Sequence, residues 1–146
     1  MKRFIQFVCL VLVFVTVFST TAFAAEPGDS RASMFFAGSS VYFWHVSGSQ
    51  YQIWFDVTAV SGMNELGASQ IVVERSTDLV NWTPVKTYYK SSYPQMTTKT
   101  TSVTYDNYVT YYPTDGYAYR AIVTLYAKNS AGTGEMDEQT AILDLR

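Results

Sequence analysis

The chain has 146 residues, of which 48% are hydrophobic and 16% aromatic, and its formal net charge is −2 at pH 7. This length and composition predict one small globular domain, and the absence of a basic tract excludes a nucleic-acid-binding protein. The only cysteine, Cys9, and the only histidine, His45, cannot supply a disulfide framework or the usual zinc ligands. We therefore expect neither a metal nor a cofactor.

The first residues have the three parts of a secretory signal peptide. Residues 1–3 (MKR) are positive, residues 4–18 are almost wholly apolar, and residues 22–24 (AFA) form an A-x-A cleavage site. A retained membrane anchor is the alternative, but a spanning helix needs about 20 apolar residues and this run is shorter. We expect residues 1–24 to be removed by cleavage between Ala24 and Ala25. The protein would then be secreted and free of the membrane.

The sequence after residue 24 predicts strands and turns. Residues 25–38 are expected to be a loose lead-in, and residues 39–146 to be the folded domain. Segments rich in Val, Ile, Thr, Tyr and Trp alternate there with Gly, Ser, Asn and Asp clusters, which is typical of an all-β protein. The expected strands are residues 40–46, 51–60, 70–75, 82–89, 99–105, 108–112, a long strand within 116–134, and 139–145. About seven short strands at this spacing predict a two-sheet antiparallel sandwich.

Alternation of apolar and polar residues assigns the faces of two strands. The residues expected to face the core are Tyr51, Ile53, Phe55, Val57 and Ala59 in one strand and Tyr119, Ala121, Val123, Leu125 and Ala127 in the other. Trp54 then lies on the opposite face of the first strand, among polar neighbours. Arg120 and Tyr126 lie on the opposite face of the second strand.

Residues 111–121 (YYPTDGYAYRA) resemble the L-x-P-x-x-x-Y-x-[YF]-R-V segment of fibronectin type III domains, which are immunoglobulin-like sandwiches. In that family the tyrosine forms a corner by hydrogen bonding to the backbone just upstream, and the resemblance assigns this role to Tyr117. Residues 127–132 (AKNSAG) match the family's A-x-N-x-x-G, four residues later than its usual spacing. An even insertion keeps every side chain on its face.

A second segment, residues 74–85 (ERSTDLVNWTPV), resembles the hairpin between strands C and C′ of bacterial fibronectin-like modules, which often read S-x-D-G-x-N-W. Leu79 occupies the glycine position. In size, leader and Tyr-rich strands, the chain also resembles small secreted proteins of Gram-positive bacteria whose function is unassigned. These resemblances imply the fold and secretion, and they imply no activity.

No catalytic motif is present. A serine hydrolase would have only His45 as a base, which is expected to be a half-buried strand histidine, and a G-x-S-x-G elbow is missing. A glycosidase needs two carboxylates, for which Asp56 and Glu74 are a conceivable pair. The acidic residues 135–138 (EMDE) lack the spacing of a calcium loop and are expected to solvate a turn.

We therefore predict a monomeric, non-catalytic binding or adhesion module for an extracellular protein or glycan. Trp54, Tyr126 and Arg120 are the candidate binding residues, because exposed aromatic rings on a sheet offer a large contact area at low entropic cost. The alternative is that these aromatic side chains are ordinary strand residues without a binding role. Two other functions remain open: a small secreted glycan hydrolase, and a structural surface protein that self-associates through a strand edge.

Overall fold

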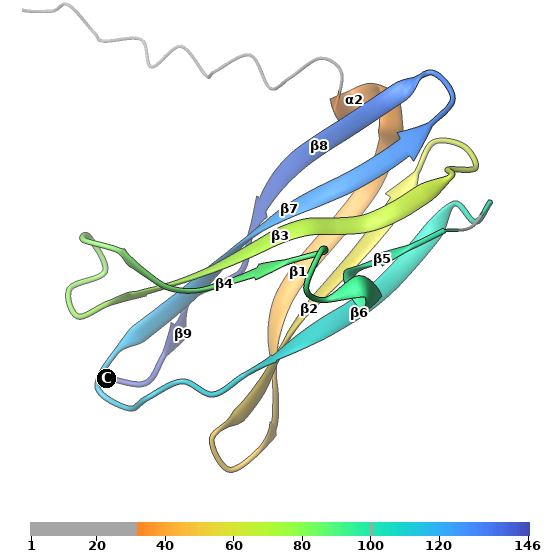
Figure 1. The fold of residues 1–146 in the computed structure, drawn as a ribbon. Helices are drawn as coiled ribbons and strands as arrows, with labels where there is room; N and C mark the ends of the chain where they lie inside the picture. Colours follow the sequence, from red (N-terminus) through yellow and green to blue (C-terminus); the bar gives the residue numbers. More distant parts are fainter. Residues whose placement is uncertain (1–31, 100) are drawn as a thin grey trace, which may run out of the picture.

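The computed structural model of the protein describes residues 32–99 and 101–146, which form two antiparallel β-sheets packed face to face (Figure 1). The predicted all-β sandwich is therefore confirmed. Within these two ranges, no helix has the length and apolar character needed to span a membrane. The predicted signal peptide and its cleavage site lie outside the described residues.

The smaller sheet has the strand order β1-β2-β6, and the larger has the order β4-β3-β7-β8, with β5 paired to β3 and β9 paired to β7. The strands are β1 (Phe36–Ser47), β2 (Gln50–Ala59), β3 (Glu65–Ser76), β4 (Thr83–Tyr89), β5 (Thr97–Thr98), β6 (Thr104–Tyr111), β7 (Ala118–Asn129), β8 (Gly132–Gln139) and β9 (Leu143–Asp144). A helical turn, α2 (Ala32–Phe35), precedes β1, and a 3₁₀ turn, η1 (Pro94–Met96), precedes β5. In Figure 1, β1 and β2 pass behind β3 and β7.

The core lies between the two sheets and follows the predicted alternation. The inward residues of β2 and β7 that are at most 4% exposed are Ile53, Phe55, Val57, Ala59, Tyr119, Ala121, Val123, Leu125 and Ala127. Tyr51, at the start of β2, is only half-buried. Successive side chains of a strand point to opposite faces, so burying one apolar set orients the whole strand.

Several predicted boundaries are wrong, and of the described residues in the strands expected at 99–105 and 139–145 only those within β6, β8 and β9 form strands. The sandwich begins before residue 39, because Phe35 and Phe36 are only 7% and 8% exposed and belong to the core. No turn separates the strands expected at residues 99–105 and 108–112, since Asp106 and Asn107 between them pair with β2 inside β6. The strand expected at residues 70–75 starts earlier, because β3 begins at Glu65.

The β3–β4 hairpin has the backbone geometry that a glycine would adopt, although Leu79 occupies that position. Leu79 has φ 64°, in the left-handed region. Asp78 holds the turn, because its Oδ1 accepts the N–H groups of Val80 and Asn81 at 2.9 and 2.8 Å. These bonds, chiefly that from Asn81, hold the pKa of Asp78 well below its usual range. The hairpin motif therefore keeps its shape without its glycine.

Leu79→Gly is expected to stabilise the protein by about 0.5–1 kcal/mol, because glycine adopts a positive φ without steric cost. The measurement is urea unfolding followed by tyrosine and tryptophan fluorescence. Val80→Gly is the matched control, since Val80 is the neighbouring residue, is 77% exposed and lacks the positive φ. Equal destabilisation by both substitutions would show that Leu79 carries no backbone strain.

Candidate functional site

Four aromatic residues form a patch on the outer face of the smaller sheet, which we call the aromatic face: Tyr42, Trp44, Trp54 and Tyr108. The register pairs Tyr42 with Trp54 and Trp54 with Tyr108, so three rings form one row across β1, β2 and β6. The Tyr42 and Trp54 rings are nearly parallel, with centroids 6.4 Å apart, and the Trp54 and Tyr108 centroids are 4.8 Å apart. Trp44 lies in the next row of β1, opposite Gln52.

The rings of the aromatic face differ in exposure. Trp44 is 58% exposed, Tyr42 41% and Tyr108 36%. Trp54 is half-buried because it has a ring on either side, and its Nε1 donates a hydrogen bond of 2.9 Å to Gln52 Oε1. Trp54 thus lies on the outer face where the alternation placed it. Its exposed partners come from two other strands. For two of them, Tyr42 and Trp44, the sequence did contain a signal, because alternation within residues 40–46 places both side chains on one face of the strand.

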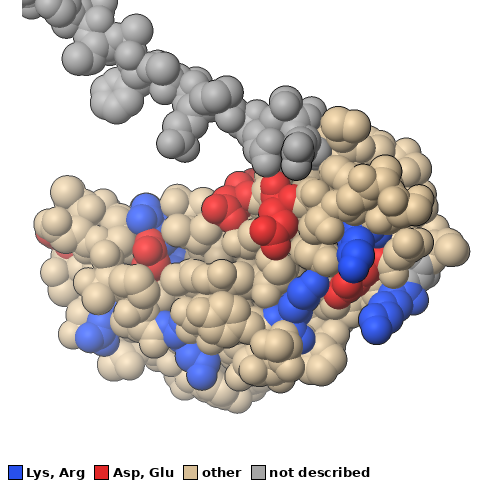
Figure 2. All heavy atoms as spheres, turned by 45° about the horizontal axis from the view of Figure 1, so that its top comes forward, with Lys and Arg blue, Asp and Glu red and all other residues tan. Residues whose placement is uncertain are grey.

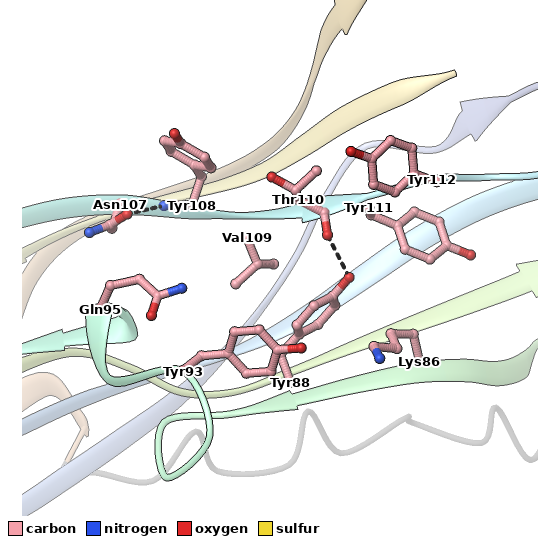
Figure 3. A pocket seen from close by; sticks show the side chains of 10 residues that line it. All are labelled: Lys86, Tyr88, Tyr93, Gln95, Asn107, Tyr108, Val109, Thr110, Tyr111 and Tyr112. Atoms are coloured by element: carbon pink, nitrogen blue, oxygen red, sulfur yellow. Dashed lines mark hydrogen bonds between the residues drawn. The ribbon is translucent and has the colours of Figure 1, made fainter. Parts of the chain in front are cut away.

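A pocket of about 570 Å³ opens between β4 and β6, next to the aromatic face (Figure 3). Five tyrosines and five other residues line it: Lys86, Tyr88, Tyr93, Gln95, Asn107, Tyr108, Val109, Thr110, Tyr111 and Tyr112. Lys86, Tyr88 and Tyr93 come from one wall and β6 forms the other. Tyr108 belongs to both the pocket and the aromatic face. The lining is rich in hydroxyl and amide groups and contains no carboxylate.

Hydrogen bonds hold the two walls of the pocket together. The Tyr88 hydroxyl donates to the Thr110 carbonyl at 2.8 Å and so links the larger sheet to the smaller (Figure 3). The Tyr105 hydroxyl donates to the Gln95 carbonyl at 2.7 Å, which ties β6 to η1. Burial raises the pKa of Tyr88 above its usual range and raises the pKa of Tyr111 to about 12. Both phenols therefore remain protonated at neutral pH.

Tyr126 is not an exposed ring. It lies on the larger sheet and is only 9% exposed, because Lys90 Nζ covers it at 3.3 Å from the ring centroid. The same ammonium reaches Glu65 Oε1 at 3.3 Å, so the side chain is held across β3. The structure thus corrects the expectation that Tyr126 is available for binding. Alternation predicts the face of a strand, but not that Lys90, which directly follows β4, covers Tyr126.

Arg120 is engaged within the fold rather than facing a ligand. Its Nε donates to Glu74 Oε2 at 2.7 Å, and its guanidinium carbon lies 4.5 Å from the centroid of the Trp82 ring. Arg120 is in β7 and Trp54 in β2, so they lie on the outer faces of opposite sheets. The three predicted binding residues are therefore not brought together, because sequence alternation does not say which sheet a strand joins.

The tyrosine corner falls on Tyr119 rather than on the predicted Tyr117. The Tyr119 hydroxyl donates to the Thr114 carbonyl at 2.9 Å and accepts the Thr114 N–H at 3.0 Å. Tyr117 is half-buried, and its ring centroid lies 4.3 Å from the guanidinium carbon of Arg75. The two tyrosines are two residues apart and point the same way, so the motif could not distinguish them. Tyr119 is the buried one, and a buried phenol needs a partner.

The other candidate groups do not assemble into a catalytic or metal centre. Asp56 and Glu74 project from the outer faces of different sheets. Within the described part of the chain, no group of three or more His, Cys, Asp and Glu residues could hold a metal ion. Residues 135–138 lie in β8 rather than in a turn. His45 is exposed rather than half-buried, because the β1–β2 hairpin extends past the larger sheet (Figure 1).

The charges of the protein are dispersed. Most of the face in Figure 2 carries neither acidic nor basic side chains, and the charged ones lie in small groups of both signs. This agrees with the small net charge of −2. Long-range steering of a highly charged partner would need a larger field of one sign.

Comparisons with known proteins do not place the chain in a family. No protein-family model and no curated protein sequence matches it. One solved structure, the X-ray structure of Northeast Structural Genomics Consortium target SoR45, is similar with a TM-score of 0.38 and 10% identity. The match covers 75% of this chain and 88% of that one. A similarity at this level carries no conclusion about family or function.

Proposed function

We propose that the protein is a non-catalytic module that binds an extracellular glycan through its aromatic face. The observation that carries the proposal is the row of Tyr42, Trp54 and Tyr108 beside Trp44, in which three rings are at least 36% exposed. Adjacent exposed aromatic side chains are costly on a soluble protein, and such patches mark interaction sites. Their rings suit the apolar faces of sugar rings.

Polar side chains beside the row favour a glycan over an apolar protein partner. Gln52 and Thr110 lie in the neighbouring row on one side, and Asp56 and Asp106 lie in the row on the other. A sugar presents hydroxyl groups around its apolar face, so it needs hydrogen-bonding groups on both sides of a ring. The aromatic face has this arrangement. A wholly apolar partner surface would instead leave these polar side chains without hydrogen-bond partners.

We also propose that the sandwich is of the fibronectin type III kind and that the protein is exported. The order β4-β3-β7-β8 opposite β1-β2-β6 supports the first point, because it corresponds to strands C′, C, F and G opposite A, B and E. The corner formed by Tyr119 supports it too. The signal-like residues 1–24 support export, which would bring the aromatic face to glycans outside the cell.

Trp44→Ala is expected to weaken glycan binding about tenfold or more, because the most exposed ring of the aromatic face is removed. Retardation of the purified protein in gels containing soluble glycans measures the affinity. Trp82→Ala is the control, since Trp82 lies on the larger sheet against Arg120. Equal retardation of Trp44→Ala and the parent would exclude the aromatic face. Binding to cell-surface protein but to no glycan would favour the other partner class.

The two alternative functions have less support. A glycan hydrolase needs two converging carboxylates, whereas Asp56 and Glu74 diverge and the pocket lining contains none. A self-associating protein would use a free strand edge, and β1 and β6 are the edges of the smaller sheet. Sedimentation at several protein concentrations tests this alternative, because self-association would make the apparent mass rise with concentration.

A further inference from the structure

Two cations, Arg75 of β3 and Lys86 of β4, have no carboxylate partner among the described residues. The ion pairs of the described chain join Lys90 to Glu65, Arg120 to Glu74 and Arg146 to Asp144. Lys86 and Arg75 instead lie against tyrosine rings. Lys86 Nζ lies 5.4 Å from the Tyr88 ring centroid, and the Arg75 guanidinium carbon lies 4.3 Å from that of Tyr117.

Lys86 lies in the pocket wall and points to the same side of β4 as Tyr88, two residues later (Figure 3). Its register partner on β3 is Val73, and Arg75 is two residues further along the same face of that strand. Arg75 contacts Tyr117, whose ring packs against Tyr119, and Tyr119 in turn packs against the lining residue Tyr111. Burial raises the pKa of Tyr111, and the positive charge of Arg75 partly opposes the shift. Lys86 is therefore the cation that lines the pocket, and Arg75 influences it only through Tyr111.

The pocket is complementary to a small anion that also offers hydroxyl groups. Its lining contains one ammonium, no carboxylate, five tyrosines and the side-chain amides of Gln95 and Asn107, and Figure 3 shows Tyr88 and Tyr93 on the Lys86 side of β6. A cation with no protein counter-ion retains its full attraction for a ligand charge. The phenols and amides can donate to and accept from hydroxyl groups. Tyrosine rings add apolar surface for a sugar face.

We propose that this pocket binds the anionic unit of an acidic glycan: a sugar ring carrying one negative charge, of which a uronic acid is the simplest. The acidic group pairs with Lys86, and the ring lies among the tyrosines. The inference rests on the proposed function for the class of ligand. β6 separates the two sites, because Tyr108 is a lining residue of the pocket while its ring ends the row of the aromatic face on the other side of that strand (Figure 3). A glycan chain that crosses this edge strand can place one unit in the pocket.

The test compares a neutral oligosaccharide that carries one galacturonate unit with its methyl ester, which has the same rings without the charge. Titration calorimetry at low salt is expected to show about tenfold tighter binding of the acid form, as for one charge-assisted hydrogen bond. Lys86→Gln should remove this difference. Lys128→Gln, which deletes an exposed lysine at the far end of β7, should retain it. Added salt should reduce the preference for the acid form.

Each outcome decides between the pocket and the aromatic face. Equal affinity for acid and ester, or equal effects of the two lysine substitutions, overturns the proposal that the pocket binds the anionic unit. If Trp44→Ala abolishes binding of both forms while Lys86→Gln changes neither, the proposed function holds and this inference fails. If galacturonate alone binds in a Lys86-dependent way and Trp44→Ala has no effect on either oligosaccharide, the pocket holds and the aromatic face fails. Binding of polyglutamate in place of the sugars would assign the pocket to an acidic peptide and overturn the proposal.

Discussion

Gly67→Ala is expected to destabilise the protein by about 3 kcal/mol, through overpacking and backbone strain. Gly67 has φ 149° and lies where β3 pairs with β5. An added Cβ would overlap the Met96 carbonyl oxygen and lie 2.7 Å from Thr97 Cα. These are backbone atoms, and the Met96 side chain is fully buried in the core. Neither can move aside without opening the β3–β5 pairing.

Urea unfolding of Gly67→Ala and Gly38→Ala measures this effect. Gly38 lies in β1, its φ is not positive, and an added Cβ would have no heavy atom within 4 Å. We expect Gly38→Ala to change the free energy of unfolding by less than about 0.5 kcal/mol, as a surface substitution does. Similar losses of stability at the two positions would mean that β3 and η1 leave room for a Cβ atom at residue 67.

Tyr119→Phe is expected to cost about 2 kcal/mol of stability, because both hydrogen bonds of a buried hydroxyl are lost. The hydroxyl bonds to the N–H and the carbonyl of Thr114, which precedes β7 in the chain. Tyr119 is 1% exposed, so water has little access to replace the lost partner. The segment leading into β7 should therefore be anchored less firmly to the sandwich.

Thermal and urea unfolding of Tyr119→Phe and Tyr117→Phe separate the two tyrosines. Tyr117→Phe keeps a ring for the Arg75 guanidinium to contact and removes a hydroxyl for which no hydrogen bond is found in the described chain. We expect it to change the free energy of unfolding by less than about 0.5 kcal/mol. A larger loss of stability for Tyr117→Phe than for Tyr119→Phe would mean that Tyr117, the residue that the motif indicated, forms the tyrosine corner.

Much of the fold was predictable, because alternation is a local property of one strand. The inward residues of β2 and β7 were identified without knowledge of any neighbour, since burying one apolar set determines both faces. The hairpin motif around Leu79 was equally local. Its turn is held by hydrogen bonds that Asp78 accepts from the N–H groups of Val80 and Asn81, at most three positions away, so it forms even without glycine.

The failures of prediction occurred where contacts join distant segments. Phe35 was assigned to a loose lead-in, but Gly134 of β8 leaves space for its ring, with an added Cβ meeting it at 2.5 Å. Asp106 and Asn107 look like turn residues, yet pairing with β2 keeps them in a strand. Tyr126 looked exposed, but Lys90 from beyond β4 covers it. Such contacts depend on strand order and register, which local propensity does not encode.

The candidate site shows the same division. Period-two alternation is enough to place Trp54 on an outer face and Tyr119 in the core, because each strand must turn its apolar set away from water. Only the packed sheets bring Tyr42 and Tyr108 beside Trp54, through pairing across three strands. Only the meeting of β4 with β6 creates a pocket that contains Lys86. Chain segments far apart in sequence become neighbours through tertiary packing, and a binding site needs such neighbours.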